Sequence, residues 1–125
     1  MISHLSIGVS DLARSILFYD AALRCLGSSR VFTGDESVGY GPRPDTEGLA
    51  LKQRSKEAIG LDQGFHLAFD ADDEDAVDQF HVAALAHGGT DDGAPGLRPD
   101  YGDHYYAAFV IDPDGHRLEA VYQRG

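Results

Sequence analysis

Cysteine and long apolar runs are both scarce in this chain of 125 residues. The single cysteine, Cys25, excludes an intrachain disulfide and a metal cluster built from thiolates. No apolar run approaches the length of a membrane span, and the first residues lack the charged segment and apolar run of a signal peptide. We therefore expect a cytoplasmic protein with no membrane partner.

Basic residues are also few, which leaves a strongly acidic chain. Ten lysines and arginines stand against 21 aspartates and glutamates, and the formal net charge is -11. Such a charge repels the phosphate groups of nucleic acids and of anionic lipids, so neither is an expected partner. The hydrophobic fraction of 42% and the charged fraction of 25% are those of a globular domain.

An internal repeat organises the chain. Residues 4–27 and 66–89 align without a gap at an offset of 62 positions, and eight of the 24 aligned pairs are identical. Each copy begins with a short alternating segment, continues through an aspartate suited to cap a helix (Asp11 or Asp73), and ends in glycine. A duplication of one strand–helix unit explains this pattern better than chance does.

Segments that favour strands follow each predicted helix. They cover 30–33, 38–41 and 48–53 in the first half, and 88–92, 105–111 and 117–122 in the second. Residues 93–104 are expected to form a long connection, which in a compact domain is often functional. The fold prediction is therefore one α+β domain over 1–125, made of two tandem βαβββ modules at 1–58 and 64–125.

Two histidines fall in register in the repeat, because His4 and His66 each open one copy. Glu119 lies within the apolar segment 117–122, where a buried carboxylate would need partners. If the modules pack about a pseudo-twofold axis, these three side chains converge, and two imidazoles with one carboxylate suit a divalent metal with positions open for substrate. The alternative is that both histidines are structural and that Glu119 faces water.

Several other residues are candidates for substrate binding. The guanidinium of Arg98 suits a carboxylate or phosphonate, although a surface pairing with an acid is an equal alternative. Tyr101, Tyr105 and Tyr106 offer hydroxyl donors, but strand alternation allows only one of Tyr105 and Tyr106 to line a cavity. Three further histidines are predicted to be solvated: His81, His87 and His116.

Two stretches resemble the vicinal-oxygen-chelate superfamily, which includes glyoxalase I, bleomycin-resistance proteins, fosfomycin-resistance transferases and extradiol dioxygenases. They are "ISHLSIGVSDLARSILFYDAALRCLG" near the start and "YYAAFVIDPDGHRLEAVYQ" near the end. The resemblance implies paired modules that form a U-shaped, partly open β-barrel cavity around a divalent metal: Zn, Ni, Mn, Co or Fe. It implies His4, His66 and Glu119 as metal ligands, with Glu119 also catalytic.

One departure from the superfamily concerns a fourth ligand. Glyoxalase I has a carboxylate in the last strand of its first module, whereas Leu51 and Lys52 stand where that acid is expected here. Lys52 is a candidate to replace a metal charge near the substrate or to point outward. The resemblance implies a metal-dependent lyase or isomerase acting on a small oxygenated or thiol-adduct substrate, assembled as a homodimer. A metal-free binding protein and an iron-dependent ring-cleaving dioxygenase are the alternatives.

Overall fold

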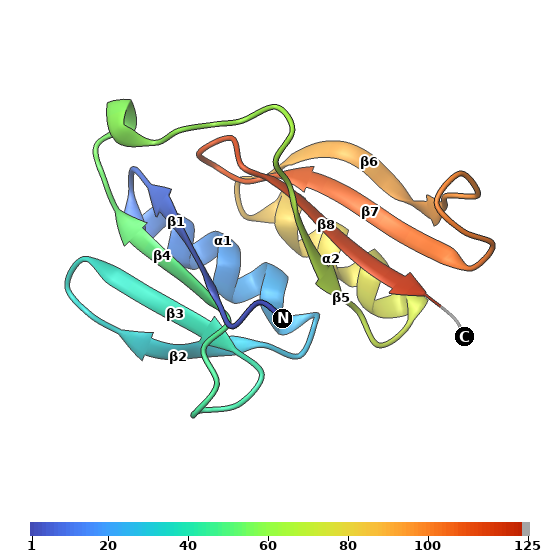
Figure 1. Cartoon of the computed structure of the whole chain (residues 1–125), viewed down its shortest axis with the longest axis horizontal. Coiled ribbons are helices and arrows are strands. Elements are labelled where there is room, and N and C mark those ends of the chain that lie inside the picture. The colour runs from blue at the N-terminus through green and yellow to red at the C-terminus, as the bar shows by residue number, and fades with distance from the viewer. Residues whose placement is uncertain (124–125) are drawn as a thin grey trace.

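The chain repeats one order of elements twice, a strand, a helix and three further strands (Figure 1). The computed structural model describes residues 1–123. The first module contains β1 (Leu5–Val9), α1 (Leu12–Arg24), β2 (Ser29–Thr33), β3 (Ser37–Gly41) and β4 (Leu49–Gln53). A short 3-10 helix, η1 (Lys56–Ala58), follows. The second module contains β5 (Leu67–Asp70), α2 (Glu74–Ala86), β6 (Thr90–Leu97), β7 (Tyr105–Ile111) and β8 (Arg117–Gln123).

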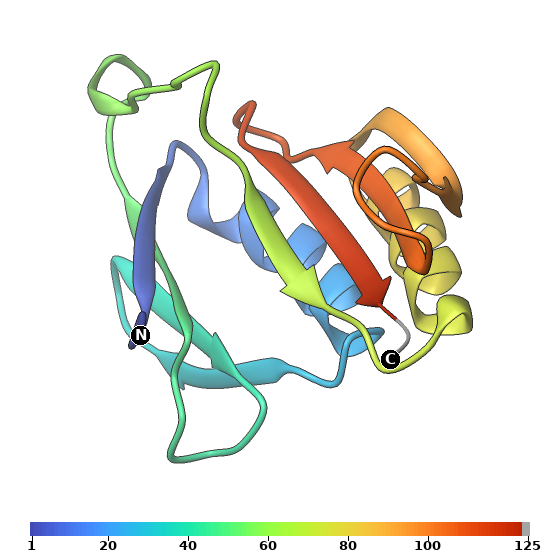
Figure 2. The same cartoon turned by 45° about the vertical axis from the view of Figure 1, so that its right-hand side comes forward.

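Each module forms its own four-stranded mixed sheet. The strand orders are β1-β4-β3-β2 and β5-β8-β7-β6, and in each sheet the first pair is parallel while the others are antiparallel. The two sheets lie beside one another and do not close into a barrel (Figure 2). The predicted α+β fold of two βαβββ modules is therefore confirmed.

Both helices begin at the aspartates that the repeat predicts. The Asp11 side chain accepts a hydrogen bond from the backbone N–H of Arg14 at 3.1 Å, and Asp73 accepts one from Ala76 at 2.7 Å. These bonds satisfy amides that have no partner within the helix. In the described part of the chain, neither helix is long and apolar enough to cross a membrane.

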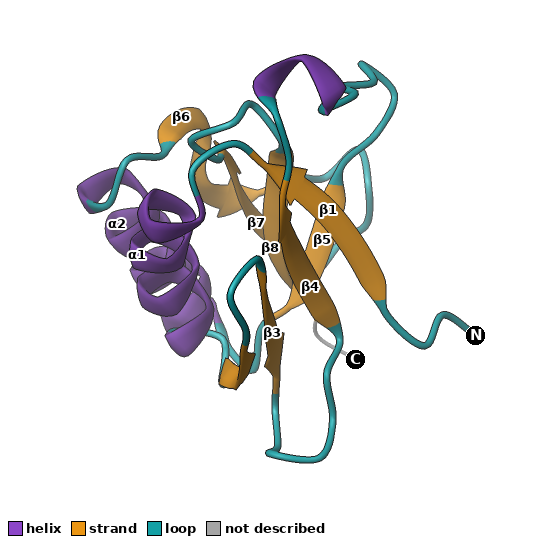
Figure 3. Ribbon diagram, turned by 90° about the vertical axis from the view of Figure 1, so that its left-hand side faces the viewer, coloured by secondary structure: helices purple, strands orange, loops and turns teal. Residues whose placement is uncertain are grey.

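The core lies between the helices and one face of each sheet. The two helices contact each other and lie on the same side of the sheets (Figure 3). Alternate strand residues point at the helices, among them Leu49 and Leu51 in β4 and Leu118 and Ala120 in β8, and all four are buried. The residues between them in each strand point to the opposite face of the sheet, which no helix covers and which we call the open face.

The turn before β8 joins the second module to the first. Asp114 accepts hydrogen bonds from the backbone N–H of Ser10 at 3.0 Å and from Arg14 at 3.2 Å, and its side chain is 4% exposed. The buried His116 ring lies 2.7 Å from the carbonyl oxygen of Gly8 in β1. The prediction that His116 is solvated is therefore wrong, because this ring fills the joint between the modules.

The predicted long connection is shorter than expected. Strand β6 extends to Leu97 through "TDDGAPGL", so that only 98–104 links it to β7. Pro95 is tolerated because β6 is an edge strand whose pairing with β7 shifts register between Gly93 and Gly96. A sequence rich in glycine, proline and aspartate gives no alternating apolar signal, which explains the error.

Candidate functional site

The open face of the second sheet holds a buried carboxylate with two partners. Glu119 points away from the helices, because its neighbours Leu118 and Ala120 point toward them, and it is 2% exposed. Nε2 of His66 lies 3.0 Å from its Oε1, and the Tyr105 hydroxyl donates a hydrogen bond to its Oε2. Both carboxylate oxygens therefore have a protein partner, which offsets the cost of burial.

Tyr105 is held as a hydrogen-bond donor by its surroundings. Burial raises the pKa of its phenol, and the hydrogen bond and negative charge of Glu119 raise it further. The hydroxyl therefore stays protonated at neutral pH. The ring of Tyr101 packs edge-on against Tyr105 with ring centroids 5.3 Å apart, and this second aromatic borders the same face.

Tyr106 lies on the other face of β7, as strand alternation predicts for neighbouring residues. Its hydroxyl donates a 2.6 Å hydrogen bond to Asp78 of α2. This contact faces the helix and not the open face, so Tyr106 lies apart from the Glu119 site. Of the two neighbouring tyrosines, Tyr105 is the one that meets a candidate functional residue.

Arg98 uses its guanidinium mainly within the second module. Nη2 donates to the carbonyl oxygens of Ala94 at 2.5 Å and Ala107 at 3.3 Å, which closes the irregular pairing of β6 with β7. The guanidinium carbon lies 5.3 Å from the centre of the Phe109 ring, and Phe109 is the strand partner of Glu119. Nε is buried with no hydrogen-bond partner among the described residues. Arg98 therefore lies at the edge of the site, where it bonds to the backbone of β6 and β7.

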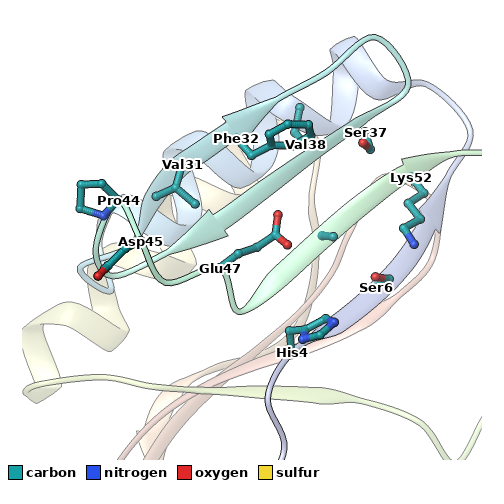
Figure 4. Close-up of a pocket in the computed structure, with 11 residues that line it drawn as sticks. His4, Ser6, Val31, Phe32, Ser37, Val38, Pro44, Asp45, Glu47 and Lys52 are labelled. Atoms are coloured by element: carbon teal, nitrogen blue, oxygen red, sulfur yellow. The ribbon is translucent and has the colours of Figure 1, made fainter.

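His4 and Lys52 lie on the open face of the first sheet, in a hollow of about 480 Å³ (Figure 4). We call this the first-module hollow; the residues of its lining used below are His4, Glu47, Ala50 and Lys52. Apart from its neighbour Ser3, 2.9 Å away at Nδ1, the exposed His4 ring has no hydrogen-bond partner in the described chain. All of the described residues that line the hollow belong to the first module.

Strand register identifies the first-module position that corresponds to Glu119. Leu5 pairs with Leu49 in the first module, and its repeat equivalent Leu67 pairs with Leu118 in the second. The residue after Leu49 is Ala50, so Ala50 corresponds to Glu119. The sequence analysis expected the missing acid at Leu51 or Lys52, which is one or two residues after the true position, Ala50. β4 contains no acidic residue at any position.

A carboxylate that the sequence analysis missed lies close to this position. Glu47 precedes β4, and its Oε1 would be 1.6 Å from a Cβ added at Gly39, the strand partner of Ala50. The carboxylate thus lies over β3 in space that only a glycine leaves free. The available signal was the glycine-containing strand "SVGYG" followed by an acid just before β4.

His66 and Glu119 are the two side chains of this site that could bind a divalent metal ion. His66 and Glu119 bring an imidazole nitrogen and a carboxylate oxygen to one point, and both donor types suit borderline divalent ions. Residues 1–123 contain no group of three or more His, Cys, Asp or Glu side chains placed to hold a metal. His4 is therefore not gathered with His66 and Glu119, and the chain supplies a two-donor set at this point.

Comparisons with known proteins agree with this architecture. The sequence profile of the Glyoxalase/Bleomycin resistance protein/Dioxygenase superfamily matches residues 1–120. A glyoxalase/bleomycin resistance protein from Albidiferax ferrireducens T118 is 30% identical, with 99% of each chain covered and a TM-score of 0.84. No curated protein matches the sequence.

More distant structures share the fold alone. The fosfomycin resistance protein FosX from Mesorhizobium loti is 20% identical, with 99% of this chain and 92% of that chain covered and a TM-score of 0.71. A glyoxalase I mutant from Zea mays is 24% identical over 95% of this chain and 45% of that one, with a TM-score of 0.71. By its sequence and by its fold, the chain belongs to the glyoxalase/bleomycin resistance protein/dioxygenase superfamily.

Proposed function

We propose that the chain is a glyoxalase-like, metal-dependent lyase or isomerase that acts on a small oxygenated or thiol-adduct substrate. The observation that carries the proposal is the approach of His66 Nε2 to Glu119 Oε1 at 3.0 Å, with the Tyr105 hydroxyl on the other carboxylate oxygen. These two donors would hold a divalent ion, which supplies positive charge to adjacent substrate oxygens.

Glu119 is the residue that moves a proton in this proposal. Its carboxylate would accept a proton at Oε1 from a substrate carbon or hydroxyl only when that oxygen is not bound to the ion, while Tyr105 keeps Oε2 hydrogen-bonded and fixes the orientation of the group. The ring of Tyr101 packs edge-on against Tyr105, the hydrogen-bond donor to this carboxylate. The Arg98 guanidinium lies over Phe109, the strand partner of Glu119, and would offer positive charge to an anionic substrate group at the edge of the site.

A third protein donor is part of the proposal. His4 is the candidate, and it would reach the ion by a rearrangement of the two modules or from a second copy of the chain in a homodimer. Its repeat equivalence to His66 supports this role. The Lys52 side chain lines the same hollow as His4 and would bind an anionic group of the substrate beside it.

A second candidate function follows from the same carboxylate. Both oxygens of Glu119 already have partners within the chain, so its burial requires no cation. Because both oxygens are hydrogen-bonded without a metal, the chain could instead be a metal-free protein that binds a small molecule on this face. The two functions differ in whether His66 and Glu119 exchange their mutual hydrogen bond for an ion.

The test is the metal content of protein that has been stripped with a chelator, reloaded and dialysed. We expect about one Zn, Ni, Mn, Co or Fe ion per chain in the wild type, and its loss in His66→Ala and Glu119→Ala. His87→Ala, at the end of α2, is the matched control, and His4→Ala tests the third donor. Wild-type protein that retains no ion with any of the five metals overturns the metalloenzyme and leaves the binding protein.

A further inference from the structure

A second hollow lies where the two modules meet, and both modules line it. Its volume is about 220 Å³. The first module contributes Leu5 of β1, Leu23 of α1 and Leu49 of β4, and the second contributes Leu67 and Phe69 of β5. β1 and β5 are edge strands of separate sheets, so no backbone ladder closes the seam between them. None of the lining residues that the structure describes is charged, and we call this apolar cavity the seam pocket.

The seam pocket lies on the helix side of the sheets, which is opposite to the open face. Leu49 and Leu118 point toward the helices and are buried, and the side chains of paired residues in a sheet point to the same face. Their strand partners Leu5 and Leu67 therefore also point to the helix side. The sheets thus separate the seam pocket from the carboxylate of Glu119.

The polar atoms around Tyr40, at the wall of the pocket, are already bonded within the chain. The Tyr40 hydroxyl donates a 2.8 Å hydrogen bond to Asp20, and the Tyr40 carbonyl oxygen accepts one from the N–H of Gly48 at 2.8 Å. The N–H of Leu5 donates to the carbonyl oxygen of Gly48 at 2.9 Å. The other hydroxyl of the described lining, that of Ser28, belongs to an exposed residue. A buried water needs about two to four polar partners, so an apolar molecule suits this wall better than water does.

A glycine marks unfilled space in the wall. A Cβ added at Gly48 would have one heavy atom near it, the carbonyl oxygen of Tyr40 at 4.0 Å. The other glycine of the lining, Gly41, is closely packed, since a Cβ there would lie 1.5 Å from the carbonyl oxygen of Thr46. Tyr40 and Leu49 are buried, and protein interiors normally contain few voids larger than a water molecule. The space beside Gly48 is therefore room that a ligand can fill.

We propose that the seam pocket is a binding site for a small uncharged molecule that carries one aromatic ring. Tyr40 and Phe69 give the ring two aromatic partners, and Leu5, Leu49 and Leu67 give it apolar contacts from both modules. The volume of about 220 Å³ is below the range of about 300–1,000 Å³ that is usual for drug-sized ligands. An engineered cavity of about 150 Å³ lined by apolar side chains binds benzene, so a single ring matches the size of this pocket.

This site is independent of the metal proposed above. The described lining of the seam pocket includes neither His4 nor His66 nor Glu119. Binding is therefore measured on chelator-treated protein, so that failure of this site and failure of the metal site are separate results.

The test titrates benzyl alcohol into protein with ¹³C-labelled leucine methyl groups and follows the methyl resonances of Leu5 and Leu67. Benzoate and benzylammonium are the controls, since they keep the ring and add a negative or a positive charge. We expect saturable shifts at both leucines with benzyl alcohol, because the ligand lies between the two modules. We expect binding at least about tenfold weaker for both charged compounds, because an ion loses hydration in a pocket without charged partners.

Two variants at one position reduce the volume of the pocket. Gly48→Val fills the space beside Tyr40 and weakens binding at least about tenfold, while Gly48→Ala weakens it about threefold and serves as the milder change if valine prevents folding. Gly96→Val is the matched control on β6, where an added Cβ meets no atom within 4 Å, and it leaves binding unchanged. The absence of saturable shifts with benzyl alcohol, equal binding of the three compounds, or wild-type affinity in the folded Gly48 variants overturns the proposal.

Discussion

Nε2 of His66 lies 3.0 Å from Oε1 of Glu119, although 53 positions separate the two residues in the chain. The contact arises because β5 and β8 are parallel neighbours in which Ala68 pairs with Glu119. His66 immediately precedes β5, so its ring reaches the carboxylate from the adjacent strand. A buried acid and an imidazole thereby share one point on the open face of the second sheet.

Removing the Tyr105 hydroxyl will destabilise the protein by weakening this arrangement. Tyr105→Phe leaves Oε2 of the buried Glu119 without its donor, and we expect the free energy of unfolding to fall by about 1–2 kcal/mol. Urea denaturation at pH 7 measures the change. Tyr106→Phe is the control: its half-buried partner Asp78 can take a water instead, so the loss is about 0.5 kcal/mol. Equal losses in the two variants would contradict this view of Glu119.

The turn before β8 holds the two modules together, and its key acceptor can be deleted. Asp114→Ala leaves the N–H and hydroxyl of Ser10 and the guanidinium of Arg14 without their shared acceptor, and we expect a loss of about 2–3 kcal/mol in unfolding free energy. Asp92→Ala, which breaks the outer pair with Arg117, changes it by about 0.5 kcal/mol or less. A thermal or urea unfolding series in which Asp114→Ala matched Asp92→Ala would rule out the turn as a joint.

Two glycines in β3 will respond differently to alanine. A Cβ at Gly41 would lie 1.5 Å from the backbone carbonyl oxygen of Thr46, which cannot move freely, so Gly41→Ala should cost about 2 kcal/mol or more. At Gly39 the obstacle is the Glu47 side chain, which can rotate away. We expect Gly39→Ala to cost about 0.5 kcal/mol or less, since only a side chain must move. Urea unfolding distinguishes them, and a larger loss for Gly39→Ala would be the contrary result.

Asp112 makes stability depend on pH in an unusual direction for a carboxylate. Burial raises its pKa, against the opposing hydrogen bond from Tyr19 and the positive potential of His116. The folded state therefore binds the proton more tightly than the unfolded chain does. Stability from this group is present below the unfolded pKa of about 3.9 and is lost as pH rises through the higher folded pKa.

The variant Asp112→Asn removes that titration and keeps one acceptor atom. We expect the unfolding free energy of the wild type to fall relative to that of the variant as pH rises from about 3.5 upward, measured by urea denaturation at several pH values. If the unfolding free energies of the two proteins change in parallel with pH, or if that of the wild type rises relative to the variant, the pKa of Asp112 is not raised in the folded protein.

The fold could be predicted from sequence to a large extent because its signals are local. The repeat fixed two equivalent modules, and the aspartates at 11 and 73 marked the helix starts that the structure confirms. β7 was predicted with its observed bounds, 105–111, because its apolar residues are strand formers. β6 was missed beyond residue 92 because an edge strand with irregular pairing needs no such pattern.

The site was less predictable because it depends on distances between elements. Register brought His66 to Glu119, and strand alternation separated Tyr105 from Tyr106, so both relationships follow once the strand order is known. The position of His4 depends on how the two modules pack, which no local pattern encodes. Glu47 lies in the irregular segment before β4, and the place of its side chain depends on Gly39 opposite it.

The most direct test of the metal site observes the His66 ring itself. In chelator-treated, ¹⁵N-labelled protein, the ring nitrogen resonances of His66 are recorded by long-range ¹H–¹⁵N correlation during titration with one equivalent of Zn²⁺. We predict a large shift at Nε2 of His66, absent in Glu119→Ala, with His87 unchanged. A His66 ring that keeps its metal-free resonances after a full equivalent of Zn²⁺ would contradict the account of His66 and Glu119 as a metal-binding pair.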